Sequence, residues 1–141
     1  MSPFQAQRQA TRNPDDGKAN LVDVLSLEFT YASTGIGLRL PLAATAANPI
    51  ALLNVALIIT TGFGVGKTVD IGDDAGTPDV DAYIDQTDLD EDAVGAMAQS
   101  LQSANAKAMG EYMTTAHDII VTLGGSPTAG AATLLAKIAR L

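Results

Sequence analysis

The chain has 141 residues, a length that fits one compact domain. It contains no Cys, which excludes disulfides, thiolate nucleophiles and cysteine-based zinc sites. The net charge of −8 at pH 7 argues against a nucleic-acid partner, because binding to phosphates needs clustered Lys and Arg.

Residues 1–20 have no apolar periodicity, and we predict a flexible N-terminal arm followed by one domain over residues 21–141. The arm holds three basic and two acidic residues, whereas the rest of the chain holds five basic and fourteen acidic residues. This opposite charge favours an arm that docks onto a partner, although a terminus without a role is the alternative. No secretory signal is expected at the N-terminus. The arm residues expected to contact a partner are Phe4, Arg8, Arg12 and Lys18.

Seven segments are predicted to be strands, because apolar or β-branched runs in them end at Gly, Pro or Asp turns. The alternation of apolar and polar residues is clearest over residues 24–31. The last segment is ambiguous, since Leu134, Leu135 and Ile138 also suit one face of a helix. The predicted strands are residues 24–31, 36–41, 54–61, 67–72, 81–85, 118–123 and 131–138.

The stretch from residue 93 to residue 113 is the least certain part, because Val94, Met97 and Leu101 recur at helical spacing behind a capping Asp90. A short helix and a loop both remain open.

The chain as a whole predicts a mostly β fold, an antiparallel β-sandwich or barrel of jelly-roll or tulip type. The most apolar stretch, residues 40–59, is broken by prolines and asparagines, so no membrane-spanning helix is expected.

A glycine-rich segment, Gly62 to Thr68, resembles a phosphate-binding loop but fails on spacing. Such a loop needs a glycine five residues before Gly66, and Thr61 stands there. The residues that follow predict a strand, whereas a phosphate-binding loop opens a helix. We therefore expect no nucleotide or other cofactor.

Ten acidic residues and no Lys or Arg lie between Asp70 and Asp92. Carboxylates of this kind bind Ca²⁺, but Gly72 and Ala75 break the EF-hand pattern. A solvated acidic face is the preferred interpretation, and no metal site is assigned.

His117, the single histidine, is expected at the surface or at a strand start, and no catalytic triad can be assembled. We expect no enzyme activity.

The order of short motifs resembles small β-sandwich proteins of tailed-phage particles. In those proteins a strand ending in Thr-x-Phe leads to a Val/Leu-Asp-Ile-Gly-Asp strand and turn, and a closing hairpin has an Ala-Gly-Ala turn. The long stretch at residues 93–113 departs from that pattern. The matching segments here are residues 58–63, 69–73, 81–84, 87–89, 118–123 and 129–132.

The resemblance implies a capsid decoration (cement) protein, made in the host cytoplasm and located on the outer surface of the virion head. Its implied partners are the major capsid protein and further copies of itself, usually as a homotrimer. A core poor in large side chains also makes oligomerisation plausible, because Ala and Gly bury little apolar area. A head-fibre or tail module that binds a host receptor or glycan is the alternative.

Overall fold

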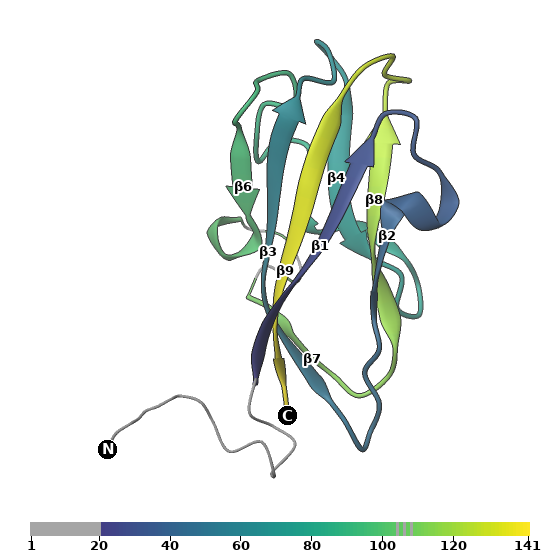
Figure 1. Ribbon diagram of the computed structural model, residues 1–141, viewed down its shortest axis with the longest axis vertical. Coiled ribbons are helices and arrows are strands. Elements are labelled where there is room, and N and C mark those ends of the chain that lie inside the picture. The colour runs from purple at the N-terminus through teal and green to yellow at the C-terminus, as the bar shows by residue number, and fades with distance from the viewer. Residues whose placement is uncertain (1–20, 104, 106, 108) are drawn as a thin grey trace, which may run out of the picture.

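Two antiparallel sheets face each other in the computed structural model, which describes residues 21–103, 105, 107 and 109–141 (Figure 1). The expectation of an antiparallel β-sandwich is confirmed. The predicted arm, with Phe4, Arg8, Arg12 and Lys18, lies outside the described residues.

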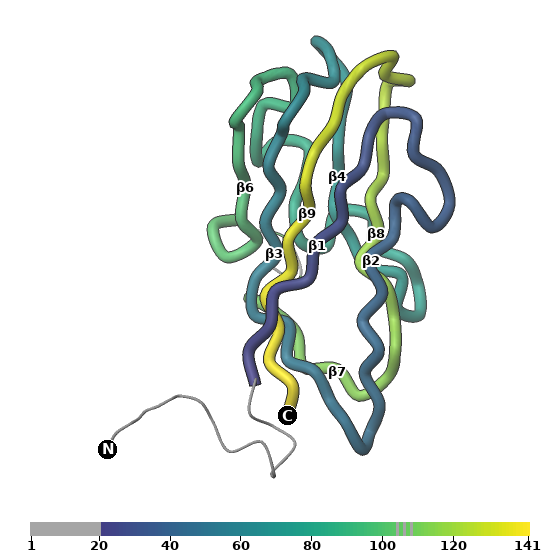
Figure 2. The backbone as a smooth tube through the Cα atoms, viewed as in Figure 1, coloured from purple at the N-terminus to yellow at the C-terminus, as the bar shows by residue number. Residues whose placement is uncertain are grey.

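The first sheet has five strands and the second has four. The first sheet has the order β1 (Val22–Thr30), β9 (Ala131–Arg140), β3 (Ile50–Thr61) and β6 (Met97–Gln99), and β7 (Glu111–Met113) also pairs with β3. The second sheet has the order β2 (Arg39–Leu42), β8 (His117–Gly124), β4 (Thr68–Asp73) and β5 (Asp79–Ile84). The tube in Figure 2 shows the chain entering at β1 and leaving at β9, side by side in the first sheet.

The last segment is a strand, and the helical alternative is wrong. Every second residue of β9 is buried, starting at Ala132 and ending at Ile138, which is the period of a strand packed on one face. The strand lies between β1 and β3 and pairs with both. The sequence of this segment suits a helix or a strand, and pairing with a strand on each side makes it a strand.

Residues 93–113, for which the sequence left a short helix or a loop open, form no α-helix among their described residues. The segment forms β6, the short 3₁₀ turn η3 (Ser100–Gln102) and β7. Gly95 and Gly110 adopt positive φ angles of 85° and 95°, so the chain turns sharply at both places. The two turns place β6 and β7 against the same strand, β3.

The expected strand at residues 36–41 begins later than predicted. Gly35–Leu38 form the 3₁₀ turn η2, and the strand runs from Arg39 to Leu42. Pro41 does not end this strand, because β2 is an edge strand and pairs only with β8. A proline is tolerated where its missing N–H would face away from the ladder.

The core lies between the sheets and includes the buried rings of Phe29 and Phe63, whose centroids are 6.2 Å apart. Leu57, Ile59 and Leu134 are completely buried in the first sheet. The described residues contain no helix of the length and apolarity needed to cross a bilayer.

One buried hydroxyl group binds the backbone of β3 close to a bulge. The register between β3 and β9 shifts between Leu52 and Asn54, just before Val55, which is fully buried. The Val55 N–H donates a hydrogen bond of 2.9 Å to Ser100 Oγ, and Ser100 Oγ donates one of 3.1 Å to Asn54 Oδ1. Ser100, which directly follows β6, therefore supplies an acceptor for the Val55 N–H on the side of β3 where the pairing with β6 has ended.

We expect Ser100→Ala to lower the free energy of unfolding by about 1–3 kcal/mol, because it leaves the buried Val55 N–H without an acceptor. Urea denaturation at pH 7 measures the loss. Ser33→Ala is the matched control, since Ser33 Oγ accepts from Thr30 N–H at an exposed position where water can replace it. Its expected change is within about 0.5 kcal/mol. Equal losses in the two variants would contradict the role given to Ser100.

Candidate functional site

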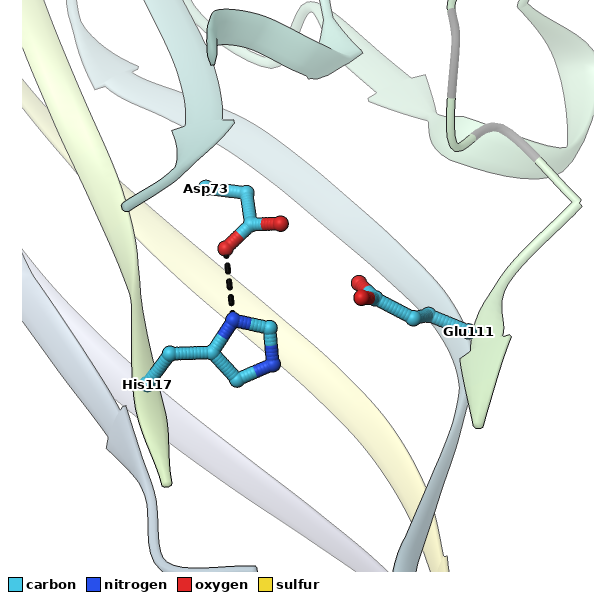
Figure 3. A group of neighbouring side chains, drawn as sticks. All are labelled: Asp73, Glu111 and His117. Atoms are coloured by element: carbon cyan, nitrogen blue, oxygen red, sulfur yellow. Dashed lines mark hydrogen bonds and ion pairs between the residues drawn. The ribbon is translucent and has the colours of Figure 1, made fainter. Parts of the chain in front are cut away.

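A cluster of ionisable side chains lies where β4, β7 and β8 come together. Asp73 ends β4, His117 begins β8 and Glu111 begins β7. Asp73 Oδ1 and His117 Nδ1 are 2.7 Å apart, and the two side chains are only 2% and 7% exposed. Figure 3 shows the carboxylate of Glu111 extending from β7 toward this pair.

Lys107 supplies the positive charge of the cluster. Its ammonium group contacts Asp73 Oδ2 and lies 3.0 Å from Glu111 Oε2. The second Glu111 oxygen accepts a 2.9 Å hydrogen bond from the hydroxyl of Tyr83. His117 Nε2 lies 3.1 Å from the sulfur of Met113, so both ring nitrogens of His117 have neighbours. The cluster therefore meets its own hydrogen-bonding needs.

The environment fixes the charges of the cluster near neutral pH. Burial acts to raise the pKa of Asp73, but hydrogen bonds from Lys107 and the Ala75 N–H, with the nearby positive charges, bring this pKa below its usual value. Burial acts to lower the pKa of Lys107, but hydrogen bonds to Asp73 and Glu111 raise it overall. Burial, followed by the negative charges of Glu111 and Asp73, raises the pKa of Tyr83. The cluster thus contains an ionised Asp73 and a protonated Lys107.

Asp73, Glu111 and His117 are also residues of the kinds that hold divalent metal ions. Their ligand atoms lie within 4.8 Å of one another. However, the ammonium group of Lys107 already contacts both carboxylates, and the Nδ1 atom of His117 is bonded to Asp73. A metal would have to displace Lys107, so we interpret the group as an ion-pair cluster that fastens the segment before β7 to the sandwich.

No local pattern in the sequence predicts this cluster. His117 begins β8, which is one of the two positions expected for it, and its side chain is only 7% exposed. Its partner Asp73 is 44 residues away, and Lys107 is 34 residues from Asp73. Only the pairing of β4 with β8 brings Asp73 near the start of β8.

Several donors of the glycine-rich segment after β3 are hydrogen-bonded to other parts of the protein. The N–H of Gly64 donates a 3.1 Å hydrogen bond to the carboxylate of Asp92, and the N–H of Phe63 donates to the carbonyl of Glu91. The ammonium group of Lys67 donates to the carbonyl of Gly125 at 2.7 Å. The carboxylate of Asp92 thus binds one of the amides that a phosphate-binding loop would direct at its ligand.

Acidic groups collect around the second sheet. Asp118 takes an outward position in β8, and Asp74 follows β4 directly. Arg39 joins the two through contacts with both carboxylates, of which Nε to Asp118 Oδ2 measures 2.7 Å. Farther along, a hydrogen bond with Asp79, followed by burial and by the like charge of Asp79, raises the pKa of Asp81. Part of the predicted acidic face is therefore internally paired, and part of it repels itself.

The outer face of the first sheet is nearly uncharged. Among its outward strand positions within the described residues, only Glu28 and Lys137 carry a charge. Large apolar side chains are exposed across this face, which is uncommon for a surface without a partner. They include Val22, Val24, Leu53, Met97 and Tyr112.

Three comparisons with known proteins found no relative. No protein-family model, no curated protein and no solved structure matches the chain. The function is therefore inferred from the chain itself.

Proposed function

We propose that this chain is a phage virion structural protein, a capsid decoration protein that binds the outer surface of the head and stabilises it by bridging capsid subunits. The motif order described above supports this proposal. The mostly β sandwich is compatible with it, and the charged groups near His117 are bonded to one another rather than arranged around a substrate cleft. We propose no catalytic role.

The observation that carries the proposal is the outer face of the first sheet, which is nearly uncharged although the protein as a whole is acidic. A net charge of −8 makes copies of this protein repel one another and repel other acidic proteins. A sheet face with only Glu28 and Lys137 as charges removes that repulsion locally and offers apolar area to a partner. The acidic remainder would be unfavourable beside packaged DNA and is compatible with a place outside the shell.

Binding to capsids assembled without this protein tests the proposal. We expect Met97→Asp, on the outer face of the first sheet, to weaken binding at least tenfold in a co-sedimentation assay, because a carboxylate would be buried in the contact. Met109→Asp is the matched control, since Met109 is exposed on the segment between η3 and β7, outside the strands of the first sheet. Equal binding by the two variants would contradict the assignment of the face.

The arm is tested separately by removing residues 1–20. We expect the shortened protein to bind the capsid more weakly and to keep the circular-dichroism spectrum of the full chain. Unchanged binding would remove the arm from the proposal and would leave the sheet face in place.

A depression on the first sheet favours the alternative, a module that binds a host receptor or glycan. It measures about 390 Å³ and is lined by Glu28 and by several hydroxyl groups. Hydroxyls and one carboxylate are groups that hydrogen-bond sugars. Binding to host cells or glycans without any affinity for capsids would favour this second function. The lining hydroxyl residues are Thr30, Ser33, Thr60 and Thr133.

A further inference from the structure

The edge strands of the two sheets differ in how well they are protected from pairing with another chain. The edge strand β2 has only four residues and contains Pro41, and β6 and β7 have three residues each. The edge of β5 is covered, because Lys107 N–H and Ser103 Oγ donate to the carbonyls of Ala82 and Tyr83. The remaining edge, β1, is nine residues long, contains no proline and pairs in one unbroken register. Long, regular edges of this kind are templates for strand addition.

We infer that β1 pairs antiparallel with β1 of a second copy, so that the first sheets of two copies form one continuous sheet. This inference goes beyond the capsid role and does not depend on it. In Figure 1, β1 lies at the margin of its sheet, with β9 on one side, and the described residues place no strand of the sheet beyond it.

Backbone hydrogen bonds at the two ends of β1 show which residues face the open edge. The Tyr31 N–H donates to the Gly130 carbonyl at 3.0 Å, and the Leu21 carbonyl accepts from Arg140 N–H at 2.7 Å. Odd-numbered residues of the strand therefore bond to β9, and even-numbered residues point their N–H and C=O groups outward. Thr30 is already capped, since its N–H donates to Ser33 Oγ. The open groups belong to Val22, Val24, Ser26 and Glu28.

The core beside β1 is also incomplete. Leu25 and Leu27 take core-facing positions but are only half-buried, whereas the core-facing Leu134 and Ile138 of the neighbouring β9 are fully buried. A second strand placed along the open edge would cover these two leucines. Covering them removes apolar area from water in both copies at once.

One register satisfies all the open groups without using Thr30. It places Val22 opposite Glu28 of the second copy and Val24 opposite Ser26 of the second copy, with hydrogen bonds exchanged in each pair. The two-fold axis then passes between the Leu25 residues of the two copies. No like charges lie directly opposite each other in this register, because each acidic residue of β1 meets an apolar one.

This arrangement is a pair with two-fold symmetry, so it competes with the trimer implied by the resemblance. Native mass spectrometry of the full chain separates the two, since the pair has twice and the trimer three times the monomer mass of 14.4 kDa. We expect the pair. A monomer or a trimer as the dominant species would overturn the inference.

Single-cysteine variants test the register, because the chain has no cysteine of its own. At the two-fold axis the Leu25 residues form a pair that is not hydrogen-bonded, with Cα atoms about 4.5 Å apart. That distance suits a disulfide, whereas the other positions lie too far from their own copies. On mild oxidation we expect Leu25→Cys to form the linked pair at least tenfold faster than Val24→Cys, Ser26→Cys or Leu27→Cys. Preferential linking at another position would overturn this register, and equal linking at all four would overturn specific pairing.

Ser26→Pro is a second test of the pairing between copies, and it does not depend on whether Leu25→Cys folds. The Ser26 N–H points away from β9, so Ser26→Pro removes a donor that the isolated chain does not use in its sheet. We expect this variant to keep its circular-dichroism spectrum and to become monomeric. A folded Ser26→Pro protein that still forms the pair would overturn the inference.

Discussion

Asp73→Asn is expected to lower the free energy of unfolding at pH 7 by about 3–5 kcal/mol, the usual cost of removing one partner from a buried ion pair. Asp73 is 2% exposed and contacts both Lys107 and His117, and it also accepts a hydrogen bond of 2.9 Å from the Ala75 N–H. An amide keeps one acceptor but no negative charge. Urea denaturation followed by circular dichroism measures the loss.

Asp81→Asn is the matched control, because it makes the same chemical change one strand away. Asp81 lies beside Asp79, and its pKa is raised first by a hydrogen bond with Asp79, then by burial and by the like charge of Asp79. Neutralising Asp81 relieves that repulsion, so we expect a change within about 0.5 kcal/mol, in the stabilising direction. A loss as large as that of Asp73→Asn would show that any neutralised carboxylate in this region is costly, which would contradict the role of the cluster.

The pH dependence gives a second check on Asp73. Its pKa is lower in the folded protein than its unfolded value of about 3.9. The ionised group therefore contributes stability above that unfolded value and loses the contribution as the pH falls through the folded pKa. The pKa of Lys107 is raised, so its contribution is complete below the unfolded value of about 10.4 and is lost as the pH rises through the folded pKa. The difference between the wild type and Asp73→Asn should hence be flat near neutrality and shrink in acid.

The strand content could be predicted because most strands carry local signals. In β1 the alternation of apolar and polar residues matches the observed alternation of half-buried and exposed side chains. Local signals failed where pairing decided the outcome. Residues 97–99 and 111–113 are too short to show a period, and they become strands because β3 offers them partners. The order of strands in each sheet also has no local signature.

The polar cluster could not be predicted for a related reason. Asp73 belongs to a run of acidic residues, and nothing in that run marks it as the one that faces inward. The pairing of β4 with β8 sets this direction, and Lys107 reaches it from a segment whose structure the sequence left open. The exposed apolar face could be derived from the alternation in each strand, but only once β1, β9 and β3 were known to share a sheet.

Gly72→Ala is the second change with a large expected effect, and it acts through backbone packing. Gly72 lies in β4 directly before Asp73, and a β-carbon built there would collide with the backbone of Asp79 and Val80 in β5. The register between these strands shifts between Ile71 and Asp73, on either side of Gly72. Because the colliding atoms belong to backbone, they cannot rotate away as a flexible side chain would. We expect a loss of about 3 kcal/mol or more in the free energy of unfolding.

Gly37→Ala is the control for this change. Gly37 lies in η2, and a β-carbon there would meet Ser33 Cβ at 3.5 Å, an ordinary contact, so we expect a change within about 0.5 kcal/mol. The Gly72 variant should also disturb the cluster, since moving β5 shifts Tyr83 away from Glu111, whose carboxylate also contacts Lys107. A double-mutant cycle with Tyr83→Phe measures this link. If the two losses add without any coupling energy, then β5 does not hold the cluster in place and Gly72 matters for packing alone.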